Sequence, residues 1–328
     1  MFNKKNILIT GGTGSFGKSL VKYLTKNFKD INRLIIFSRD ELKQYEMKKS
    51  FDPKKFKFIR YFIGDMRDKD RLLRALEDVD IVFHAAALKQ VDTSEYNPFE
   101  FIKTNVLGAQ NLIEACIDKN VKKVLALSTD KASSPINLYG ATKLCSDKLF
   151  VSANNITGKR DMAFSVLRYG NVLYSRGSIL PLLLDWYKSK KEFLITDKNM
   201  TRFNIDLESA VKLSTECIKN MYGGEIFIPK LKSYRTIDLA KSLDPNRKIK
   251  FIGLRPGEKI HEEMISATDS KNTYDLGKNF VIINPLNKTL IEKYKKFPKM
   301  KGSTSYNSFE NENYLNLKEL KKIINFYI

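Results

Sequence analysis

The sequence of 328 residues, 42% of them apolar, is longer than a single hydrophobic core usually allows, so it predicts one large domain and a smaller one. No apolar run approaches the roughly 18 residues that cross a bilayer, which excludes a membrane-spanning helix and a membrane partner. The formal net charge of +21 comes from Lys and Arg spread along the whole chain, without the Arg-rich patch typical of nucleic-acid readers, so no nucleic-acid partner is expected.

Apolar runs alternate with amphipathic stretches from the N-terminus on. The first run passes directly into a glycine loop, which indicates a first strand and not a targeting segment. Six runs rich in Val, Ile, Leu and Phe are typical of buried parallel strands, at 6–10, 33–38, 56–64, 80–86, 122–128 and 164–170. Helical patterns separate them at 15–28, 69–78, 99–120 and 138–155. This alternation predicts an α/β fold, a Rossmann domain with a doubly wound parallel sheet, over residues 1–170.

The second half of the chain is less regular. Beyond residue 171, shorter elements are separated by Pro and Gly. We expect a smaller α/β domain over residues 171–328 that mainly binds substrate and is interleaved with the last strands of the sheet. The three cysteines, Cys116, Cys145 and Cys217, are widely spaced without a CxxC pair, which predicts reduced thiols in a cytoplasmic protein. No metal site is expected.

A glycine-rich motif follows the first predicted strand. Its spacing is GxxGxxG, and a helical pattern begins at once after it. A pyrophosphate needs this close backbone approach and the N–H groups of a helix N-terminus. We therefore expect a dinucleotide to bind at Gly11, Thr13, Gly14, Ser15, Phe16 and Gly17.

The end of the second predicted strand bears on the choice of cofactor. NAD enzymes place an acidic residue there for the ribose 2′-hydroxyl, whereas a 2′-phosphate favours Arg. This chain has Ser38 and Arg39 at that point, with Lys43 one helical turn further, so NADP is favoured, although an ion pair between Arg39 and Asp40 stays open. The expected cofactor residues here are Ser38, Arg39, Asp40, Glu41, Leu42 and Lys43, followed by Asp65 and Met66 at the adenine and Ala86 at the ribose.

Tyr139 and Lys143 form a YxxxK pair at the start of a predicted helix. One turn separates them, so both side chains share a face, and an ammonium beside a phenol is expected to lower the phenol pKa from about 10. The phenolate would then take the proton of a sugar hydroxyl. Ser128 and Thr129 lie about ten residues upstream, and Asp130 and Lys131 follow at the carboxyl end of the same strand, the edge where ligands of open α/β sheets bind.

A series of motifs connects this chain to a known family. In order, they are TGGTGSFGK (10–18), SRDELKQ (38–44), HAAALK (84–89), EYNP (95–98), ALSTDKASSPINLYGATKLCSDKLF (126–150), RYGNV (168–172), SRGS (175–178), MTRF (200–203), GGEIFIPK (223–230) and RPGEK (255–259). With these motifs the chain resembles the inverting UDP-N-acetylglucosamine 4,6-dehydratases, which belong to the extended short-chain dehydrogenase/reductase family and begin pseudaminic acid synthesis.

The resemblance implies roles for individual residues. It implies that Asp130 and Lys131 act as acid and base, that Tyr139 and Lys143 are the oxidising pair, and that Thr129 belongs to the catalytic group. It adds Val172 to the cofactor site. It places near the substrate Lys89, Asn171, Arg176, Thr196, Met200, Arg255 and Glu258. It also implies NADP as cofactor, UDP-N-acetylglucosamine as substrate and assembly into a homo-oligomer.

The chain departs from the family pattern at a few positions near the expected sugar. Gln90 and Asp92-Thr93 replace residues that are usually His, Pro and a small apolar residue, and Asn204 replaces an aromatic one. Tyr174 replaces a glycine, and we expect it to narrow the sugar pocket.

The implied reaction is redox-neutral: oxidation at C4, loss of water across C5 and C6, and reduction at C6 with inversion at C5. As a base, Lys131 needs a pKa lowered from about 10.4, which burial favours and the neighbouring Asp130 opposes. Two alternatives remain. One is a sugar 4-epimerase or a retaining dehydratase, and the other is a non-catalytic, NADP-sensing Rossmann protein.

Overall fold

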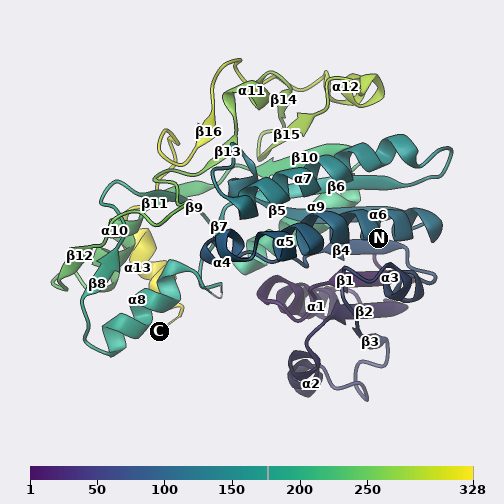
Figure 1. Cartoon of the computed structure of the whole chain (residues 1–328), viewed down its shortest axis with the longest axis horizontal. Helices are drawn as coiled ribbons and strands as arrows, with labels where there is room; N and C mark the ends of the chain where they lie inside the picture. The colour runs from purple at the N-terminus through teal and green to yellow at the C-terminus, as the bar shows by residue number, and fades with distance from the viewer. Residues whose placement is uncertain (176, 328) are drawn as a thin grey trace.

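The computed structural model describes residues 1–175 and 177–327. A nine-stranded sheet forms its centre, in the order β14-β15-β10-β6-β5-β4-β1-β2-β3 (Figure 1). Seven neighbouring strands run parallel: β1 (Asn6–Thr10), β2 (Arg33–Ser38), β3 (Ile59–Ile63), β4 (Ile81–His84), β5 (Lys123–Thr129), β6 (Ala163–Tyr169) and β10 (Glu225–Pro229). β15 (Asn279–Ile283) and β14 (Thr273–Asp275) complete it with antiparallel pairings. The predicted doubly wound α/β fold is confirmed.

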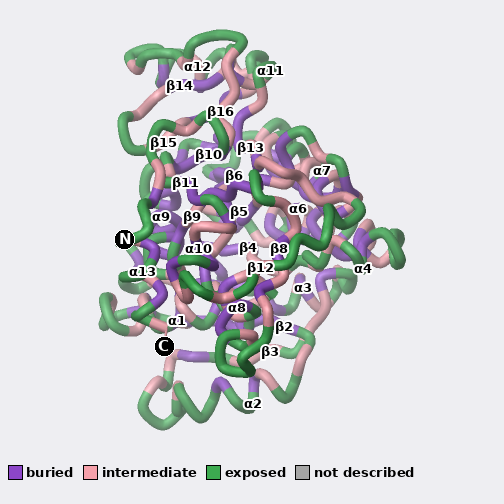
Figure 2. The backbone as a smooth tube through the Cα atoms, turned by 90° about the vertical axis from the view of Figure 1, so that its left-hand side faces the viewer, coloured by how far each residue is buried: buried purple, intermediate pink, exposed green. Residues whose placement is uncertain are grey.

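Helices cover both faces of this sheet. Side chains of α1 (Ser15–Asn27) and α9 (Leu207–Asn220) pack on one face, together with α2 (Glu41–Ser50) and α12 (Lys288–Tyr294). The other face is covered by α3 (Lys69–Ala75), α6 (Gly108–Asp118) and α7 (Leu138–Ala153). Because helices bury both faces, the inner strands are almost fully apolar, and they form the buried centre of the molecule (Figure 2).

The long helical pattern predicted at 99–120 is divided in the structure. α4 (Val91–Tyr96) and α5 (Pro98–Phe101) precede a π-helical segment, Ile102–Leu107, which continues into α6. Asn105 lies in that segment, and its amide pairs with both backbone groups of Leu88 at 2.8 Å. The irregular segment thereby fixes the loop after β4 at the edge of the sheet.

A second group of elements lies beside the carboxyl ends of the parallel strands. It contains the small sheet of β7 (Asn171–Val172), β9 (Thr201–Ile205) and β11 (Lys232–Arg235), and the pair of β8 (Phe193–Ile195) and β12 (Ile249–Phe251). Its helices are α8 (Ile179–Lys188), α10 (Thr236–Leu243) and α13 (Leu317–Asn325), which share a separate apolar core. β13 (Glu263–Ile265), β16 (Tyr306–Asn307) and α11 (Ala267–Ser270) lie closer to β10 (Figure 1). Residues 171–328 thus contribute both to this group and to the central sheet.

Within the described part of the chain, no helix has the length and apolarity needed to cross a bilayer.

Candidate active site

A cavity of about 740 Å³ lies between the carboxyl ends of the parallel strands and the second group of elements. It is lined by the loops after β1, β2, β4, β5 and β6, which surround the point where the strand order reverses between β1 and β4. Every predicted site residue that the structure describes lines it, except Glu41 and Leu42, whose side chains are exposed to solvent. Arg176 lies outside the described residues.

The glycine loop forms one end of the cavity. Gly14 is the N-cap of α1 and provides no side-chain cap, so N–H groups of the first helical turn are left for a ligand. Gly11 has a φ of +64°, and a Cβ there would lie 2.8 Å from the backbone nitrogen of Ala86. A glycine cradle at an uncapped helix N-terminus fits the pyrophosphate of a dinucleotide.

The next part of the cavity lies after β2. Ser38 is buried, and Gln44 Nε2 donates to its Oγ at 3.0 Å. Arg39 approaches Asp65 at 3.7 Å, whereas Lys43 pairs with Asp40, the N-cap of α2. Asp40 therefore pairs with Lys43 and not with Arg39. The strand ends on Ser38 and not on a carboxylate, and each positively charged side chain there has a carboxylate within ion-pair distance, Asp65 for Arg39 and Asp40 for Lys43.

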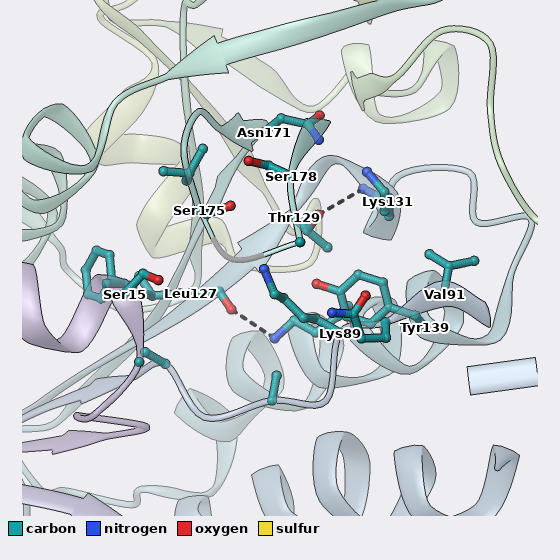
Figure 3. Close-up of a pocket in the computed structure, with 18 of the residues that line it drawn as sticks. Ser15, Lys89, Val91, Leu127, Thr129, Lys131, Tyr139, Asn171, Ser175 and Ser178 are labelled. Carbon is teal, nitrogen blue, oxygen red and sulfur yellow. Dashed lines mark hydrogen bonds between the residues drawn. The ribbon is translucent and has the colours of Figure 1, made fainter. Parts of the chain in front are cut away.

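Tyr139 and Lys143 lie in the middle of the cavity on the first turns of α7. Lys143 Nζ donates to the carbonyl of Leu127 at 2.8 Å (Figure 3). Burial lowers the pKa of Lys143, while Asp147 opposes this. Burial also raises the pKa of Tyr139 to about 12, although Lys131 and a hydrogen bond with Thr129 act to lower it. The expected lowering of the Tyr139 pKa is therefore wrong, because desolvation of the phenolate outweighs the nearby positive charge.

Asp130 and Lys131 follow β5 in a short 3₁₀ turn. Asp130 is 1% exposed, and its Oδ1 lies 3.2 Å from Lys131 Nζ and accepts from Thr129 Oγ1 at 2.9 Å. Burial raises the pKa of Asp130, Lys131 lowers it and the negative charge of Glu262 raises it. Burial acts to lower the pKa of Lys131, but the carboxylates of Asp130 and Glu262 raise it above its usual value. The pKa of each of these two neighbours therefore lies above its usual value.

Two charged residues beside this pair were not predicted. Glu262 Oε1 accepts a hydrogen bond from Lys131 Nζ at 2.8 Å, and the Glu262 side chain is 1% exposed. Arg202 is also buried, with its Nε 3.7 Å from Glu262 Oε1. Arg202 lies within the MTRF motif, and Glu262 lies three residues after the RPGEK motif. Closeness to these family motifs is the one feature of the sequence that could have indicated the two residues.

The remaining predicted substrate residues enclose the far end of the cavity. Lys89 points into it from the loop after β4, and Asn171 from β7 (Figure 3). Burial and the charge of Lys131 lower the pKa of Lys89. Arg255 and Glu258 form an ion pair of 3.0 Å, and Thr196 and Met200 line the wall near it.

Five buried polar atoms that line the cavity have no hydrogen-bond partner among the described residues. They are Thr104 Oγ1, Asp130 Oδ2, Asn171 Oδ1, Ser178 Oγ and Glu262 Oε2. Buried polar groups in native proteins are nearly always satisfied, so this set indicates a polar ligand.

Some of the residues that depart from the family pattern line the cavity, and others do not. Gln90 and Asp92 line the cavity. Tyr174 does not: its ring stacks on Tyr327 with 4.3 Å between centroids, on the C-terminal side of α13. The expectation that Tyr174 narrows the sugar pocket is therefore wrong, because a φ of +62° turns this residue toward the C-terminal segment.

Comparison with known proteins agrees with this geometry. A family model described as "Polysaccharide biosynthesis protein" matches residues 7–284. An inverting UDP-N-acetylglucosamine 4,6-dehydratase from Campylobacter jejuni is 53% identical, covering 99% of this chain and 98% of its own length. A protein named UDP-glucose 4-epimerase from Rickettsia bellii is 41% identical, covering 99% and 96%.

Solved structures show the same fold. The X-ray structure of Pen from Bacillus thuringiensis has a TM-score of 0.89 and 38% identity, and covers 99% of both chains. A dTDP-glucose 4,6-dehydratase from Streptomyces venezuelae, solved with NAD bound, has a TM-score of 0.68 at 22% identity and covers 78% of this chain and 86% of its own, which shows a shared fold alone.

Proposed function

Because this chain belongs to the polysaccharide biosynthesis protein family and to the same family as the inverting UDP-N-acetylglucosamine 4,6-dehydratases, we propose that it catalyses this reaction. The product would be a UDP-2-acetamido-2,6-dideoxy-hexos-4-ulose with C5 inverted. Its use would be in nonulosonic (pseudaminic) acid or surface-glycan synthesis.

One observation carries the proposal: the Tyr139–Lys143 pair and the Asp130–Lys131 pair line the same cavity in a chain that is 53% identical to such a dehydratase. The first pair suits oxidation of a hydroxyl and the second suits elimination of water. A protein that only senses the cofactor has no need of either pair.

NADP is the proposed cofactor. The glycine cradle would hold its pyrophosphate, and Arg39 and Lys43 would hold its 2′-phosphate. When bound, it supplies reversible hydride transfer. Tyr139, Lys143 and Asp130 line the same cavity as the glycine loop, and the sugar ring would have to lie beside these three side chains.

The protein's own groups then move protons. Tyr139, in its ionised form, takes the proton of the C4 hydroxyl. With a ketone at C4, the C5 hydrogen becomes acidic, and Lys131 removes it. Asp130 gives its proton to the departing C6 hydroxyl, and its raised pKa suits this role because it holds the proton until then.

The test is incubation of the purified protein with UDP-N-acetylglucosamine, followed by proton NMR. The proposal predicts loss of the C6 hydroxymethyl signals and appearance of a C6 methyl signal. A product that keeps its hydroxymethyl group contradicts it.

A second candidate is a 4-epimerase, which the 41% identical relatives named UDP-glucose 4-epimerase favour. Epimerisation needs oxidation and reduction at C4 but no group to remove the C5 hydrogen. The same spectrum distinguishes the two, since an epimer keeps the hydroxymethyl signals and changes only its C4 coupling pattern.

A further inference from the structure

The side chain of Glu262 is held firmly beside Lys131. Its backbone N–H donates to Ser308 Oγ at 2.9 Å, and its carbonyl accepts from the Ser308 N–H at 2.7 Å. Ser308 Oγ in turn lies 2.7 Å from Thr201 Oγ1 in β9. These contacts fix the backbone from which the carboxylate reaches Lys131 Nζ at 2.8 Å.

A purely structural role does not explain this carboxylate. Arg202, another positively charged neighbour, donates to the carbonyls of Ile260 and Lys259 at 2.9 Å and stays 3.7 Å from Glu262. Glu262 is one of the residues that line the cavity, and its Oε2 is buried without a hydrogen-bond partner among the described residues. A buried carboxylate oxygen without a hydrogen-bond partner destabilises the folded protein. A residue that is kept at this cost is expected to have a function.

Ionisable groups from several elements surround Lys131. Asp130 beside it and Glu262 before β13 bring carboxyl groups, whereas Arg202 in β9 is positive. Lys89 and Lys259 interact with it electrostatically from two further loops. The phenols of Tyr139 and Tyr234 also face it, from α7 and β11. Of these groups, Glu262 makes the shortest contact with Nζ and lies furthest from Lys131 in sequence.

We propose that Glu262 is a positioning residue for Lys131, which orients Nζ toward the sugar and stabilises the ammonium that forms when Lys131 takes the C5 proton. This inference rests on the proposed function. In the step, the Nζ lone pair takes the proton, and the C5–H electron pair becomes the C5–C6 double bond. The C6–O bond breaks with its electrons going to oxygen, which takes the Asp130 proton and leaves as water. Glu262 stays ionised throughout, as a carboxylate does beside a catalytic histidine.

The proposal makes a prediction about pH. Elimination requires Lys131 without its proton, so its rate rises with pH until the Lys131 pKa is passed. A negative charge at this distance raises a lysine pKa by about 1–3 units. Glu262→Gln keeps the shape and the acceptor but removes the charge. In a plot of the elimination rate against pH, the rising limb should therefore move to lower pH by about 1–3 units. The rate on the plateau should fall by roughly tenfold or more, because the base is weaker and less well oriented.

The experiment measures deuterium incorporation at C5 of UDP-N-acetylglucosamine-derived product in D₂O, as a function of pH. Glu262→Asp moves the charge away by one methylene, so its limb should fall between those of the wild type and Glu262→Gln. Glu263→Gln is the matched control. Glu263 is the residue after Glu262, and its carboxylate accepts hydrogen bonds from the hydroxyl groups of Ser133 and Ser134 and does not line the cavity. Its limb and plateau should match the wild type.

Each outcome decides a different point. A wild-type protein without C5 exchange contradicts the proposed function, and the inference with it. An active wild type whose limb stays in place in Glu262→Gln contradicts the inference alone, as does an equal shift in Glu263→Gln. Should Glu262→Gln fail to fold in a thermal melt, Glu262→Asp decides, since a wild-type limb in that variant overturns the proposal.

Discussion

At the scale of single residues, burial determines the acid–base state of the cavity as much as charged neighbours do. Asp130 and Lys131 are adjacent in sequence, which predicts that each stabilises the charge of the other. In the structure, desolvation raises the pKa of Asp130, while a third residue, Glu262, helps to raise the pKa of Lys131. The adjacent pair is visible in the sequence, whereas Glu262 comes from 131 residues away and meets Lys131 only in the fold.

The cofactor preference is also a property of single residues. The chain should bind NADP more tightly than NAD, because Arg39 and Lys43 lie where an NAD enzyme has a carboxylate. Arg39 makes only a long contact with Asp65, so it can turn to a phosphate without losing a close ion pair. Loss of such a charge-assisted contact costs about 1.5–3 kcal/mol, which is about 10- to 150-fold in affinity. Arg39→Ala should weaken NADP by this factor and leave NAD unchanged.

Calorimetric titration of the stripped protein with both dinucleotides measures this. Lys49→Ala is the control, since Lys49 lies on the same helix, stacks over Tyr45 and does not line the cavity. Equal or tighter binding of NAD by the wild type refutes the assignment.

At the scale of elements, the loops around the cavity are tied together by caps and buried polar contacts. Asn137 caps α7 by accepting from the Gly140 N–H and donates to the carbonyl of Gly257, both at 2.7 Å. The segment that carries Arg255 and Glu258 is thereby attached to the helix that carries Tyr139. The helical pattern at 138–155 predicted the helix, but not its link to a loop more than a hundred residues away.

A hydrogen bond between His84 in β4 and Thr10 in β1 connects these two strands and makes the stability of the protein depend on pH. Thr10 Oγ1 accepts from the N–H groups of Ala85 and Ala86, so its own hydrogen points to His84 Nδ1 at 2.8 Å. Burial, with a smaller contribution from Lys143, lowers the pKa of His84 to about 3. The unfolded chain takes up this proton below about pH 6.5 and the folded one does not. Stability from this residue is therefore fully present above pH 6.5 and falls by about 1.4 kcal/mol per pH unit down to about pH 3.

Denaturant unfolding of the wild type and of His84→Asn between pH 5 and 6.5 isolates this effect as the difference between their slopes, because the carboxyl groups are the same in both proteins. His84→Asn keeps an acceptor for Thr10 and should be less stable overall, but its stability should vary less with pH. The other histidine provides the control: His261→Asn should keep most of the wild-type slope, since His261 is only partly buried. A His84→Asn protein with the full wild-type slope contradicts the assignment.

The predicted elements agree with the structure where hydrophobic pattern alone determines them. The strands at 6–10 and 33–38 match β1 and β2, because both are buried on both faces. The strand expected at 56–64 is shorter, since residues before Ile59 form turns at the end of the sheet. α2 was absent from the predicted helices, because its helical face carries few apolar residues and depends on the Asp40 cap.

At the scale of the whole molecule, the chain returns to its first sheet after building the substrate side of the cavity. β10, β15 and β14 extend the sheet beyond β6, although they come from the second half of the chain. A sequence pattern cannot show this return, because strand pairing between distant segments leaves no local signal. The division at residue 170 therefore stays a prediction about domains, whereas the fold class is confirmed.

The central claim is that one cavity oxidises C4 and removes water across C5 and C6 of the same sugar. The measurement that tests it most directly is the location of hydrogen isotopes in product formed from UDP-N-acetylglucosamine in D₂O. The account predicts one solvent deuterium at C5 and none in the C6 methyl group, whose third hydrogen comes from C4 of the same molecule. Solvent deuterium in the methyl group, or a product that keeps hydrogen at C5, would contradict it.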